Sequence, residues 1–538
     1  MKGIIDILKD RVTESPDRII YNFLDYSAGQ STPQPADRPA GQEITLKMIF
    51  DNAKALAAEL LAKGAKRGDR VVILSMQDPG TLYAVYGAMM AGTVFTVIPP
   101  PIDEGKVQRF ISVVKSCKPK FVISNYTLEQ EQHTHVHTQQ AQVDVKKRLI
   151  RDALLPALRL KRIYTDRLPA VTRDIPIYSA AWDQVVYLQY TSGSTSDPKG
   201  VMVTLENLMT NISQVMDVYD FSTGNSLAMW VPFFHNLGLL FGFFLPLMAL
   251  EGTTYFLPTL QFLQKPTLWL RVLAEFNVNI TAGPNSAYAV FEHILGPQEA
   301  AAYDLSHVTH FINGSEFVDP ATIRNFTRLF SVSPNAFTPG YGLAENVCLA
   351  TEASRNYQTL WVDAEALRRN RFVPCAQGEG KEMVSLGKPV KGLTMVAVDP
   401  ESGKPCEDGQ IGEIYIQGDS VCKGYWENTK DNENFRARVE GLGGYFYKTG
   451  DLGIIYRGNF YMTGRIKEVI IVNGHNVYPA DIRTVLQKHI PALSMDSAVF
   501  FPVEANKQEA VAICLETDKV SLDFASLASQ INHVTAKY

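Results

Sequence analysis

The sequence is poor in the features that mark a disulfide-stapled, zinc-binding or nucleic-acid-binding protein. Its 538 residues contain 6 cysteines without a Cys-x-x-Cys pair, so we predict neither a disulfide framework nor a zinc knuckle. The formal net charge is only -5, which gives no global electrostatic reason to bind nucleic acid or an anionic membrane. We therefore expect a cytoplasmic protein without a nucleic-acid partner.

Long apolar runs are also missing. The longest, residues 237–250, is shorter than the roughly 20 residues that span a bilayer, and it contains Pro246. Near the amino terminus, Asp6, Lys9 and Asp10 interrupt the stretch where a secretory signal needs unbroken apolar residues. The sequence therefore predicts no membrane span and no secretion signal, and the apolar run is interpreted as a buried helix or core strand.

The first part of the chain has a regular alternation of helical and strand patterns. Apolar residues recur at helical spacing over residues 46–63, and a continuous apolar run follows at 70–75. The same order repeats before the runs at 94–98 and 121–124. This alternation predicts an α/β fold with a doubly wound parallel sheet that carries helices on both faces.

The pattern changes from residue 393 onward. Short apolar segments at 394–398 and 411–417 are separated by turn residues, which predicts a separate antiparallel β unit. After Gly464 come a strand pattern at 469–472 and a helical pattern at 480–489. We therefore expect a domain boundary with a hinge near this glycine.

The strongest local signal is the string Tyr190-Thr-Ser-Gly-Ser-Thr-Ser-Asp-Pro-Lys-Gly200. Its glycines allow backbone N–H groups to approach phosphate oxygens, its hydroxyls donate hydrogen bonds, and Lys199 supplies a positive charge. It is not a Walker A loop, because Lys199 precedes its glycine. A plain Ser/Gly turn would explain the glycines but not the order. We expect a phosphate-binding loop with contacts from Thr191, Ser192, Gly193, Ser194 and Thr195.

This string and several later segments resemble the adenylate-forming superfamily of acyl-CoA synthetases, luciferases and adenylation domains. Residues 313–316, 340–345, 448–452 and 464–467 resemble its motifs in order, and the resemblance extends along nearly the whole chain. It implies an α/β fold: a large N-terminal domain, residues 1–464, with two doubly wound α/β subdomains and a small antiparallel β unit. An incomplete α+β C-terminal subdomain would follow at 465–538.

The resemblance also implies roles for single residues. Tyr341 would stack on adenine, and Glu345 would hold magnesium. Asp451 would bind both ribose hydroxyls, Arg465 would lie near the ribose and phosphate, and Lys467 would be the hinge pivot. These roles suit the side chains, because a carboxylate accepts two hydroxyl donors and Mg²⁺ prefers hard oxygen ligands. The expected nucleotide-binding residues further include Gly314, Ser315, Glu316, Gly340, Gly342 and Leu343.

Within the superfamily, the closer resemblance is to the fatty acyl-AMP ligases. It rests on residues 232–238, 262–266 with Trp269, 283–288 and 473–479. Residues 352–387 resemble the insertion that in these ligases restrains the smaller domain and disfavours free coenzyme A. The resemblance therefore implies transfer of the acyl group to the phosphopantetheine of an acyl carrier protein. Asn236 departs from the aspartate that is usual after the preceding histidine.

The residues themselves give a hint about the acid. No acidic residue lies between Asp220 and Glu251, whereas a buried ammonium group needs a carboxylate partner. We therefore expect a fatty or other apolar acid without an α-amino group. Core packing explains any single aromatic residue here equally well, and His235 is either a gate or a core histidine. The expected acyl-binding residues are Phe233, Phe234, His235, Asn236, Gly238, Pro284 and Tyr288.

We expect the acid's carboxylate to attack the α-phosphorus of ATP and release pyrophosphate, with Mg²⁺ and the phosphate loop neutralising charge. The expected catalytic residues are Lys199, His235, Glu345 and Arg465. The family carries a Ser-Gly-Lys motif near its C-terminus, and the last lysines of this sequence, Lys507, Lys519 and Lys537, lack that context. We therefore expect a chain cut from a longer protein, which binds ATP and acid but forms adenylate slowly.

Two alternatives stay open from the sequence. An acyl-CoA synthetase shares the first step and differs in the acceptor thiol. A non-catalytic acyl-adenylate-binding protein would explain the missing lysine motif. The acid, its chain length, the carrier and the oligomeric state do not follow from the residues.

Overall fold

The computed structural model describes residues 2–26, 40–75, 77–127, 160–169, 174–191, 198–219, 221, 224–248, 252–353, 356–472, 475–490, 498–505, 508–515 and 524–535. The chain divides into two compact units. Unit 1 comprises Met1–Tyr357, Val390–Leu393 and Gly418–Phe435, and unit 2 comprises Gln358–Pro389, Thr394–Gln417 and Arg436–Tyr538. Two short segments from the later chain therefore belong to unit 1.

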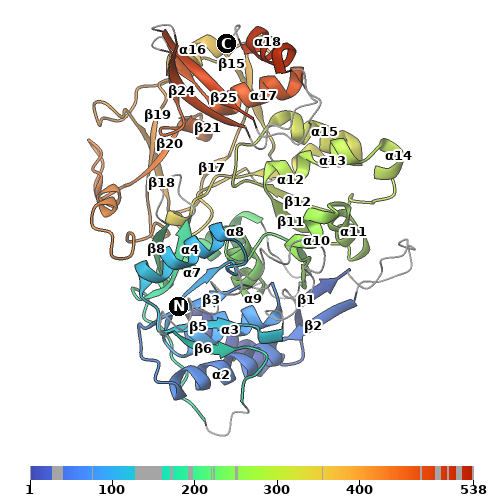
Figure 1. The fold of residues 1–538 in the computed structure, drawn as a ribbon, viewed down its shortest axis with the longest axis vertical. Coiled ribbons are helices and arrows are strands. Elements are labelled where there is room, and N and C mark those ends of the chain that lie inside the picture. The colour runs from blue at the N-terminus through green and yellow to red at the C-terminus, as the bar shows by residue number, and fades with distance from the viewer. Residues whose placement is uncertain are drawn as a thin grey trace. The chain divides into compact units, whose positions relative to one another are not determined.

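A six-stranded sheet forms one half of unit 1 (Figure 1). In spatial order its strands are β6 (Lys161–Tyr164), β5 (Phe121–Ser124), β3 (Arg70–Leu74), β4 (Val94–Ile98), β7 (Val185–Thr191) and β8 (Lys199–Thr204). Neighbouring strands are parallel except β7 and β8, which form an antiparallel pair. The sequence patterns predicted β3, β4 and β5 correctly.

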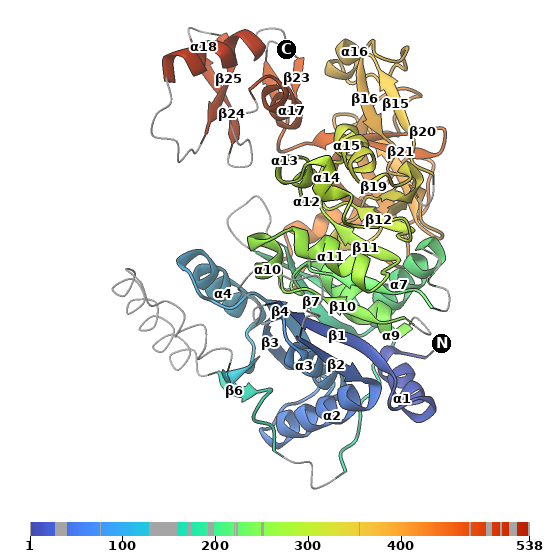
Figure 2. The same ribbon diagram turned by 90° about the vertical axis from the view of Figure 1, so that its right-hand side faces the viewer.

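Helices cover this sheet on both faces, as the alternation predicted. The helices are α1 (Ile4–Glu14), α2 (Leu46–Ala62), α3 (Pro79–Met90) and α4 (Glu104–Cys117). Apolar residues of α4 pack on the face that carries Val72 and Leu74, and α3 lies on the opposite face (Figure 2). Asp78 and Asp103 begin α3 and α4, because each carboxylate accepts backbone N–H groups of the first helical turn.

A seven-stranded sheet forms the other half of unit 1. In spatial order its strands are β13 (Phe337–Pro339), β12 (His310–Asn313), β11 (Ile280–Gly283), β9 (Leu227–Met229), β10 (Thr254–Phe256), β1 (Ile19–Asp25) and β2 (Ala40–Thr45). Neighbouring strands are parallel except β1 and β2. The helices around it are α10 (Thr259–Gln264), α11 (Thr267–Glu275), α12 (Asn285–Ala289), α13 (Phe291–Ile294), α14 (Pro297–Ala300) and α15 (Pro320–Phe330). The two sheets confirm the prediction of two wound subdomains.

The described part of the apolar run, residues 237–248, is a helix, most of which is buried. It consists of α8 (Asn236–Leu239), the π-helical turn η1 (Leu240–Phe244) and α9 (Leu245–Met248). A proline inside a helix has no N–H for the i→i−4 bond, and Pro246 lies directly after the wider turn. Within the described ranges, no helix is long and apolar enough to cross a membrane.

Unit 2 contains the predicted antiparallel sheet. Its four strands, in spatial order, are β18 (Thr394–Val398), β19 (Gly412–Gln417), β20 (Tyr447–Tyr456) and β21 (Asn459–Arg465). The predicted insertion forms the hairpin of β15 (Thr359–Val362) and β16 (Lys381–Val384), with α16 (Ala364–Arg368) between these strands. The later elements are β22 (Ile470–Val472), β23 (His475–Val477), α17 (Pro479–His489), β24 (Val499–Ala505), β25 (Gln508–Cys514) and α18 (Phe524–Thr535). The strand and helix patterns expected after Gly464 are thus present.

The remaining elements are short, apart from one helix that matters for the site. This is α7 (Leu205–Tyr219), which follows β8 directly. The short elements are η2 (Pro334–Ala336), η3 (Ala344–Asn346), η4 (Asp431–Arg436), β14 (Thr351–Glu352) and β17 (Lys388–Pro389).

Candidate active site

Two of the predicted nucleotide-binding segments of unit 1, residues 313–316 and 340–343, begin at the carboxyl edge of the seven-stranded sheet. Gly283, Asn313 and Pro339 lie side by side in register at the ends of β11, β12 and β13. Open sheets with parallel strands bind ligands in the crevice outside these ends. The predicted residues Pro284, Gly314, Ser315, Glu316, Gly340, Tyr341, Gly342 and Leu343 follow directly.

Asn313 lies at the centre of this edge. Its side chain is 0% exposed, and its Nδ2 donates to the Oδ1 of Asn285 at 3.2 Å. Within the described part of the chain, the Oδ1 of Asn313 has no hydrogen-bond partner. A buried acceptor without a donor is unfavourable, so a ligand with an amino group, such as adenine, fits here. Next to it, Ser315 has a left-handed φ of 70°, and Glu316 accepts the backbone N–H of Ser286.

The segment after β13 is fixed by a close turn. Tyr341 is 6% exposed, and its N–H donates to the Oγ1 of Thr351 at 3.2 Å. Only glycine fits at position 342, because a Cβ there would lie 1.7 Å from the carbonyl oxygen of Cys348. Leu343 immediately precedes η3. The fold itself therefore requires the glycine at this position of the motif, whether or not a ligand is bound.

Glu345, the predicted magnesium ligand, lies in η3 and is half-buried. Its Oε1 accepts a hydrogen bond from the hydroxyl of Tyr425 at 2.6 Å. Its backbone carbonyl accepts the N–H of Cys422 at 2.8 Å. Both the carboxylate and its backbone are therefore held by a segment distant in sequence.

A strained turn follows η3. Val347 has φ 63° and ψ -65°, and Cys348 N–H donates to the carbonyl of Asn346 at 2.7 Å, which is a γ-turn. Such a conformation persists only where the surroundings over-determine it. Here the Nδ2 of Asn236 donates to the Val347 carbonyl at 3.3 Å, and the Ser420 hydroxyl donates to Asn346 Oδ1 at 2.8 Å. Aspartate, which the family resemblance led us to expect at position 236, could not donate this bond as a carboxylate.

Buried amides on α7 hold the surrounding segments. Asn211 donates to the carbonyl of Leu349 at 2.8 Å and accepts its N–H at 3.0 Å. Asn207 and Gln214 face the same way, because residues 4 and 7 positions apart share one side of a helix. They donate to the carbonyls of Asp419 at 2.7 Å, Val421 at 3.1 Å and Lys391 at 2.8 Å. Sequence reasoning missed these amides, although polar residues at helical spacing on a buried face were a usable signal.

The ends of the predicted phosphate loop are paired. Thr191 and Lys199 lie opposite each other in the β7–β8 hairpin. The Nζ of Lys199 lies 2.8 Å from Oδ2 of Asp431 and 5.3 Å from the centroid of the Tyr425 ring. The hydrogen bond from Lys199 lowers the pKa of Asp431. The predicted contacts Ser192, Gly193, Ser194 and Thr195 lie outside the described residues.

Three predicted acyl-binding residues pack in the core of unit 1. Phe233 is 1% exposed, and its ring centroid lies 4.5 Å from that of Phe243. Tyr288 is 1% exposed, and its hydroxyl donates to the carbonyl of Ile312 at 2.9 Å. A Cβ at Gly238 would lie 2.3 Å from the carbonyl oxygen of Pro232. Core packing accounts for all three positions, while their role toward an acid stays a prediction.

Phe234 and His235 are less buried than Phe233. The carbonyl of Phe234 accepts a hydrogen bond from Gln189 at 2.9 Å. The Nδ1 of His235 accepts the N–H of Leu237 at 3.3 Å and caps α8. Burial lowers the pKa of His235, so the ring is neutral at pH 7. A capping role is therefore present, and a gating role stays a prediction.

Unit 2 brings two predicted nucleotide-binding residues together. Asp451 and Arg465 are paired across β20 and β21, and Arg465 Nε lies 2.9 Å from Asp451 Oδ1. The Asp451 side chain is 6% exposed and that of Arg465 is 56% exposed. Next to them, Glu413 accepts the N–H of Gly450 at 3.1 Å, and burial raises the pKa of Glu413. The predicted hinge residue Lys467 lies in an exposed turn after β21.

Comparison with known proteins shows which family the chain belongs to. The family model for AMP-binding enzymes matches residues 8–426. A 4-hydroxyphenylalkanoate adenylyltransferase of Mycobacterium marinum is 31% identical over 90% of this chain and 77% of its own length. The medium-chain-fatty-acid–[acyl-carrier-protein] ligase JamA of Moorena producens is 30% identical over 96% of this chain and 85% of its own length.

A solved structure has the same fold. The fatty acyl-adenylate ligase of Legionella pneumophila, in complex with acyl adenylate and pyrophosphate, is 26% identical and has a TM-score of 0.78. The match covers 99% of this chain and 89% of that one. The chain therefore belongs to the AMP-binding enzyme family, among the fatty acyl-AMP ligases and related adenylyltransferases.

Proposed function

We propose that this enzyme activates a fatty or other apolar carboxylic acid with ATP and passes the acyl group to an acyl carrier protein. A carboxylate oxygen of the acid attacks the α-phosphorus of ATP, the bond from that phosphorus to the bridging oxygen breaks, and pyrophosphate leaves. The product is an acyl-adenylate, which the phosphopantetheine thiol then attacks at the carbonyl carbon, releasing AMP. The observation that carries the proposal is the Oδ1 of Asn313, which has no hydrogen-bond partner among the described residues and lies at the edge where two predicted nucleotide-binding segments begin.

The charged residues of unit 1 suit the first step. Lys199 lies at the end of the phosphate loop, where its ammonium offsets phosphate charge once it leaves Asp431. Glu345 is a fixed oxygen ligand, and Mg²⁺ is commonly held by one or two carboxylates together with substrate phosphates. Bound there, Mg²⁺ would neutralise charge on the departing pyrophosphate. In unit 2, Asp451 and Arg465 are proposed to hold the ribose and phosphate.

The inserted hairpin supports a carrier thiol rather than free coenzyme A as acceptor. Residues of the insertion, among them Val362 and Met383, share a core cluster with Tyr478, which lies beyond the proposed boundary at residue 464. Lys381 also forms an ion pair with Asp481 at the start of α17. The insertion is thus bonded to the segment after the proposed hinge at Lys467, which we expect to limit its rotation.

The apolar surroundings support an acid without an amino group. The sequence between Asp220 and Glu251 offers no carboxylate for an ammonium ion. Relatives of this chain are named for 4-hydroxyphenylalkanoates and for medium-chain fatty acids, so these two classes are the first substrates to test.

The test is acid-dependent exchange of labelled pyrophosphate into ATP over fatty acids of increasing length, 4-hydroxyphenylalkanoates and phenylalanine. We expect exchange with the first two classes and none with phenylalanine. Thioester formation is then compared with coenzyme A and with a holo acyl carrier protein as acceptor. Failure of every acid in the panel to support exchange would overturn the proposed activation. Faster transfer to coenzyme A than to the carrier protein would identify an acyl-CoA synthetase instead.

A further inference from the structure

Two charged residues of the candidate site converge on one side chain that the sequence motifs did not point to. The hydroxyl of Tyr425 donates to Glu345 Oε1 at 2.6 Å, and the ammonium of Lys199 lies 5.3 Å from the centre of the same ring. Tyr425 is 4% exposed, and its ring contacts Phe435 edge to face at 5.2 Å. All of these residues belong to unit 1.

The segment that carries Tyr425, residues 424–432, is fastened to the β8 strand. Gly424 accepts the N–H of Met202 at 2.9 Å, and Trp426 N–H donates to the carbonyl of Gly200 at 2.8 Å. Asn432 closes the segment, because it accepts the N–H of Tyr425 at 2.5 Å and donates to its carbonyl at 3.1 Å. The Tyr425 backbone is therefore held on both sides.

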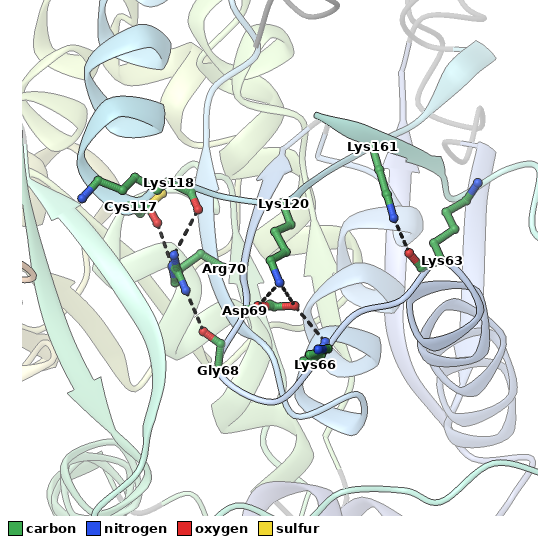
Figure 3. Close-up of polar contacts among 9 residues, drawn as sticks. All are labelled: Lys63, Lys66, Gly68, Asp69, Arg70, Cys117, Lys118, Lys120 and Lys161. Carbon is green, nitrogen blue, oxygen red and sulfur yellow. Dashed lines mark hydrogen bonds and ion pairs between the residues drawn. The ribbon is translucent and has the colours of Figure 1, made fainter. Parts of the chain in front are cut away.

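The next two residues anchor the segment to the first sheet. The guanidinium of Arg70 lies 5.5 Å from the ring centroid of Trp426, and Lys118 pairs with Glu427 at 2.6 Å. Figure 3 shows how Arg70 itself is fixed, by hydrogen bonds to the carbonyls of Cys117 at 2.7 Å, Lys118 at 3.1 Å and Gly68 at 3.2 Å. Tyr425 thus contacts the candidate site, while the two residues after it contact Arg70 and Lys118.

We propose that Tyr425 is a positioning residue, which orients the Glu345 carboxylate for a divalent cation and supports the Lys199 ammonium on its ring face. The inference deepens the proposed function and rests on it. A hydroxyl that donates to one carboxylate oxygen restricts rotation of the group and leaves the other oxygen to face a cation. A cation over a tyrosine ring is attracted by the negative face of the ring, so the same residue limits where the lysine can go.

Lys199 has a second partner in the segment that carries Tyr425. Asp431, in the same segment, holds the ammonium at 2.8 Å and is itself held by Asn428 Nδ2 at 2.8 Å. A phosphate group that enters the site must displace this carboxylate from Lys199. Tyr425 stays in place during that exchange, because its backbone is bonded to Asn432 and not to Asp431.

The experiment compares the protein with its Tyr425→Phe variant, which keeps the ring and removes the hydroxyl. Binding of Mn²⁺ is measured by electron paramagnetic resonance with an ATP analogue that cannot release pyrophosphate, so the readout needs no turnover. We expect the half-saturating Mn²⁺ concentration to rise about 10-fold, since hydrogen bonds to charged groups contribute strongly. The KM for the acid should not change.

Tyr178→Phe is the matched control. This part-buried tyrosine of unit 1 donates to the neutral Gln184, outside the candidate site. It should leave Mn²⁺ binding unchanged. Tyr425→Leu, which also removes the ring beneath Lys199, should raise the KM for ATP as well.

A double-mutant cycle separates positioning from a merely structural role. If Tyr425 acts through Glu345, the Phe substitution should have no further effect on Mn²⁺ binding in a Glu345→Gln background. An equal loss in both backgrounds, or unchanged binding in a folded Tyr425→Phe variant, would overturn the inference. If no acid supports pyrophosphate exchange by the unsubstituted protein, the proposed function fails, whatever the result for Mn²⁺ binding.

Discussion

Glu345 in unit 1 and Asp451 in unit 2 are the two carboxylates that we expect to serve the nucleotide, and they are held in opposite ways. Glu345 lies in the short helical turn η3, and its position depends on Tyr425 and on a strained turn fixed by neutral side chains. Asp451 lies within a regular strand and pairs with Arg465, its direct cross-strand neighbour.

The difference shows where each carboxylate is vulnerable. Contacts between neutral buried groups stabilise mainly by leaving no donor or acceptor unpaired, so removing one partner is expensive. An exposed cation next to a carboxylate contributes less, because water screens the pair. We therefore expect loss of the buried amides that fix the segment after Glu345 to reduce stability, and substitutions around Asp451 to affect mainly ligand binding.

The largest effect is expected for Asn211→Ala. This residue is 0% exposed, and its loss leaves the N–H of Leu349 without its amide partner, while the carbonyl of Leu349 keeps the bond from the Nδ2 of Asn346 at 2.6 Å. Stability should fall by about 3 kcal/mol, measured by urea denaturation. Asn335→Ala, an exposed position in η2, is the control and should change stability by less than about 0.5 kcal/mol. Equal effects of the two substitutions would remove the basis of the comparison.

A smaller loss is expected for Asn236→Asp, which replaces the amide by the carboxylate that the family resemblance led us to expect. The carboxylate cannot donate to the carbonyl of Val347 and places negative charge beside that oxygen. The cost should be about 1 to 2 kcal/mol in thermal or urea unfolding, because one donor to a strained turn is lost. A more stable variant would mean that the turn does not rely on this donor.

Arg465→Gln should have less effect on stability and more on the nucleotide. Because the Arg465 side chain is 56% exposed, the lost ion pair should change stability by less than about 1 kcal/mol. The KM for ATP should rise if Arg465 contacts the nucleotide, as we propose. If the substitution destabilised unit 2 and left the KM for ATP unchanged, Arg465 would have a structural role and the proposed contrast between Asp451 and Glu345 would be wrong.

The smallest expected effect is a pH dependence at His235. Burial lowers the pKa of this residue in the folded chain below its unfolded value of about 6.5. The corresponding stability is fully present above that pH and is lost as the pH falls toward the lowered value. Thermal midpoints between pH 7.5 and 5 should therefore fall less for His235→Asn, whose side chain can still cap α8. Parallel curves would show that protonation of His235 does not matter.

Sequence patterns predicted the first sheet better than the second. Strands β3, β4 and β5 are continuous apolar runs of an alternating α/β region, so their periodicity is visible along the chain. The edge strand β2 and its neighbour β1 were not predicted, because β1 pairs in parallel with β10, far along the sequence. Long-range pairing of this kind leaves no local signal.

The candidate site likewise contains segments that the sequence predicted and residues that it did not. The motif order indicated the segments at 313–316 and 340–345, and the structure brings them to one sheet edge. Tyr425, Asp431 and Asn211 were missed, because each acts through a residue that is distant in sequence. Single positions of the motif also have structural roles that the motif does not express. An example is Gly342, where no side chain fits.

The most direct test of the account is a crystal structure with a non-hydrolysable acyl-sulfamoyl adenosine, which mimics the acyl-adenylate. We predict that the adenine lies beside Tyr341 with its amino group donating to the Oδ1 of Asn313, at the carboxyl edge of the seven-stranded sheet. A nucleotide bound elsewhere, with that oxygen still unpaired, would contradict the proposed site.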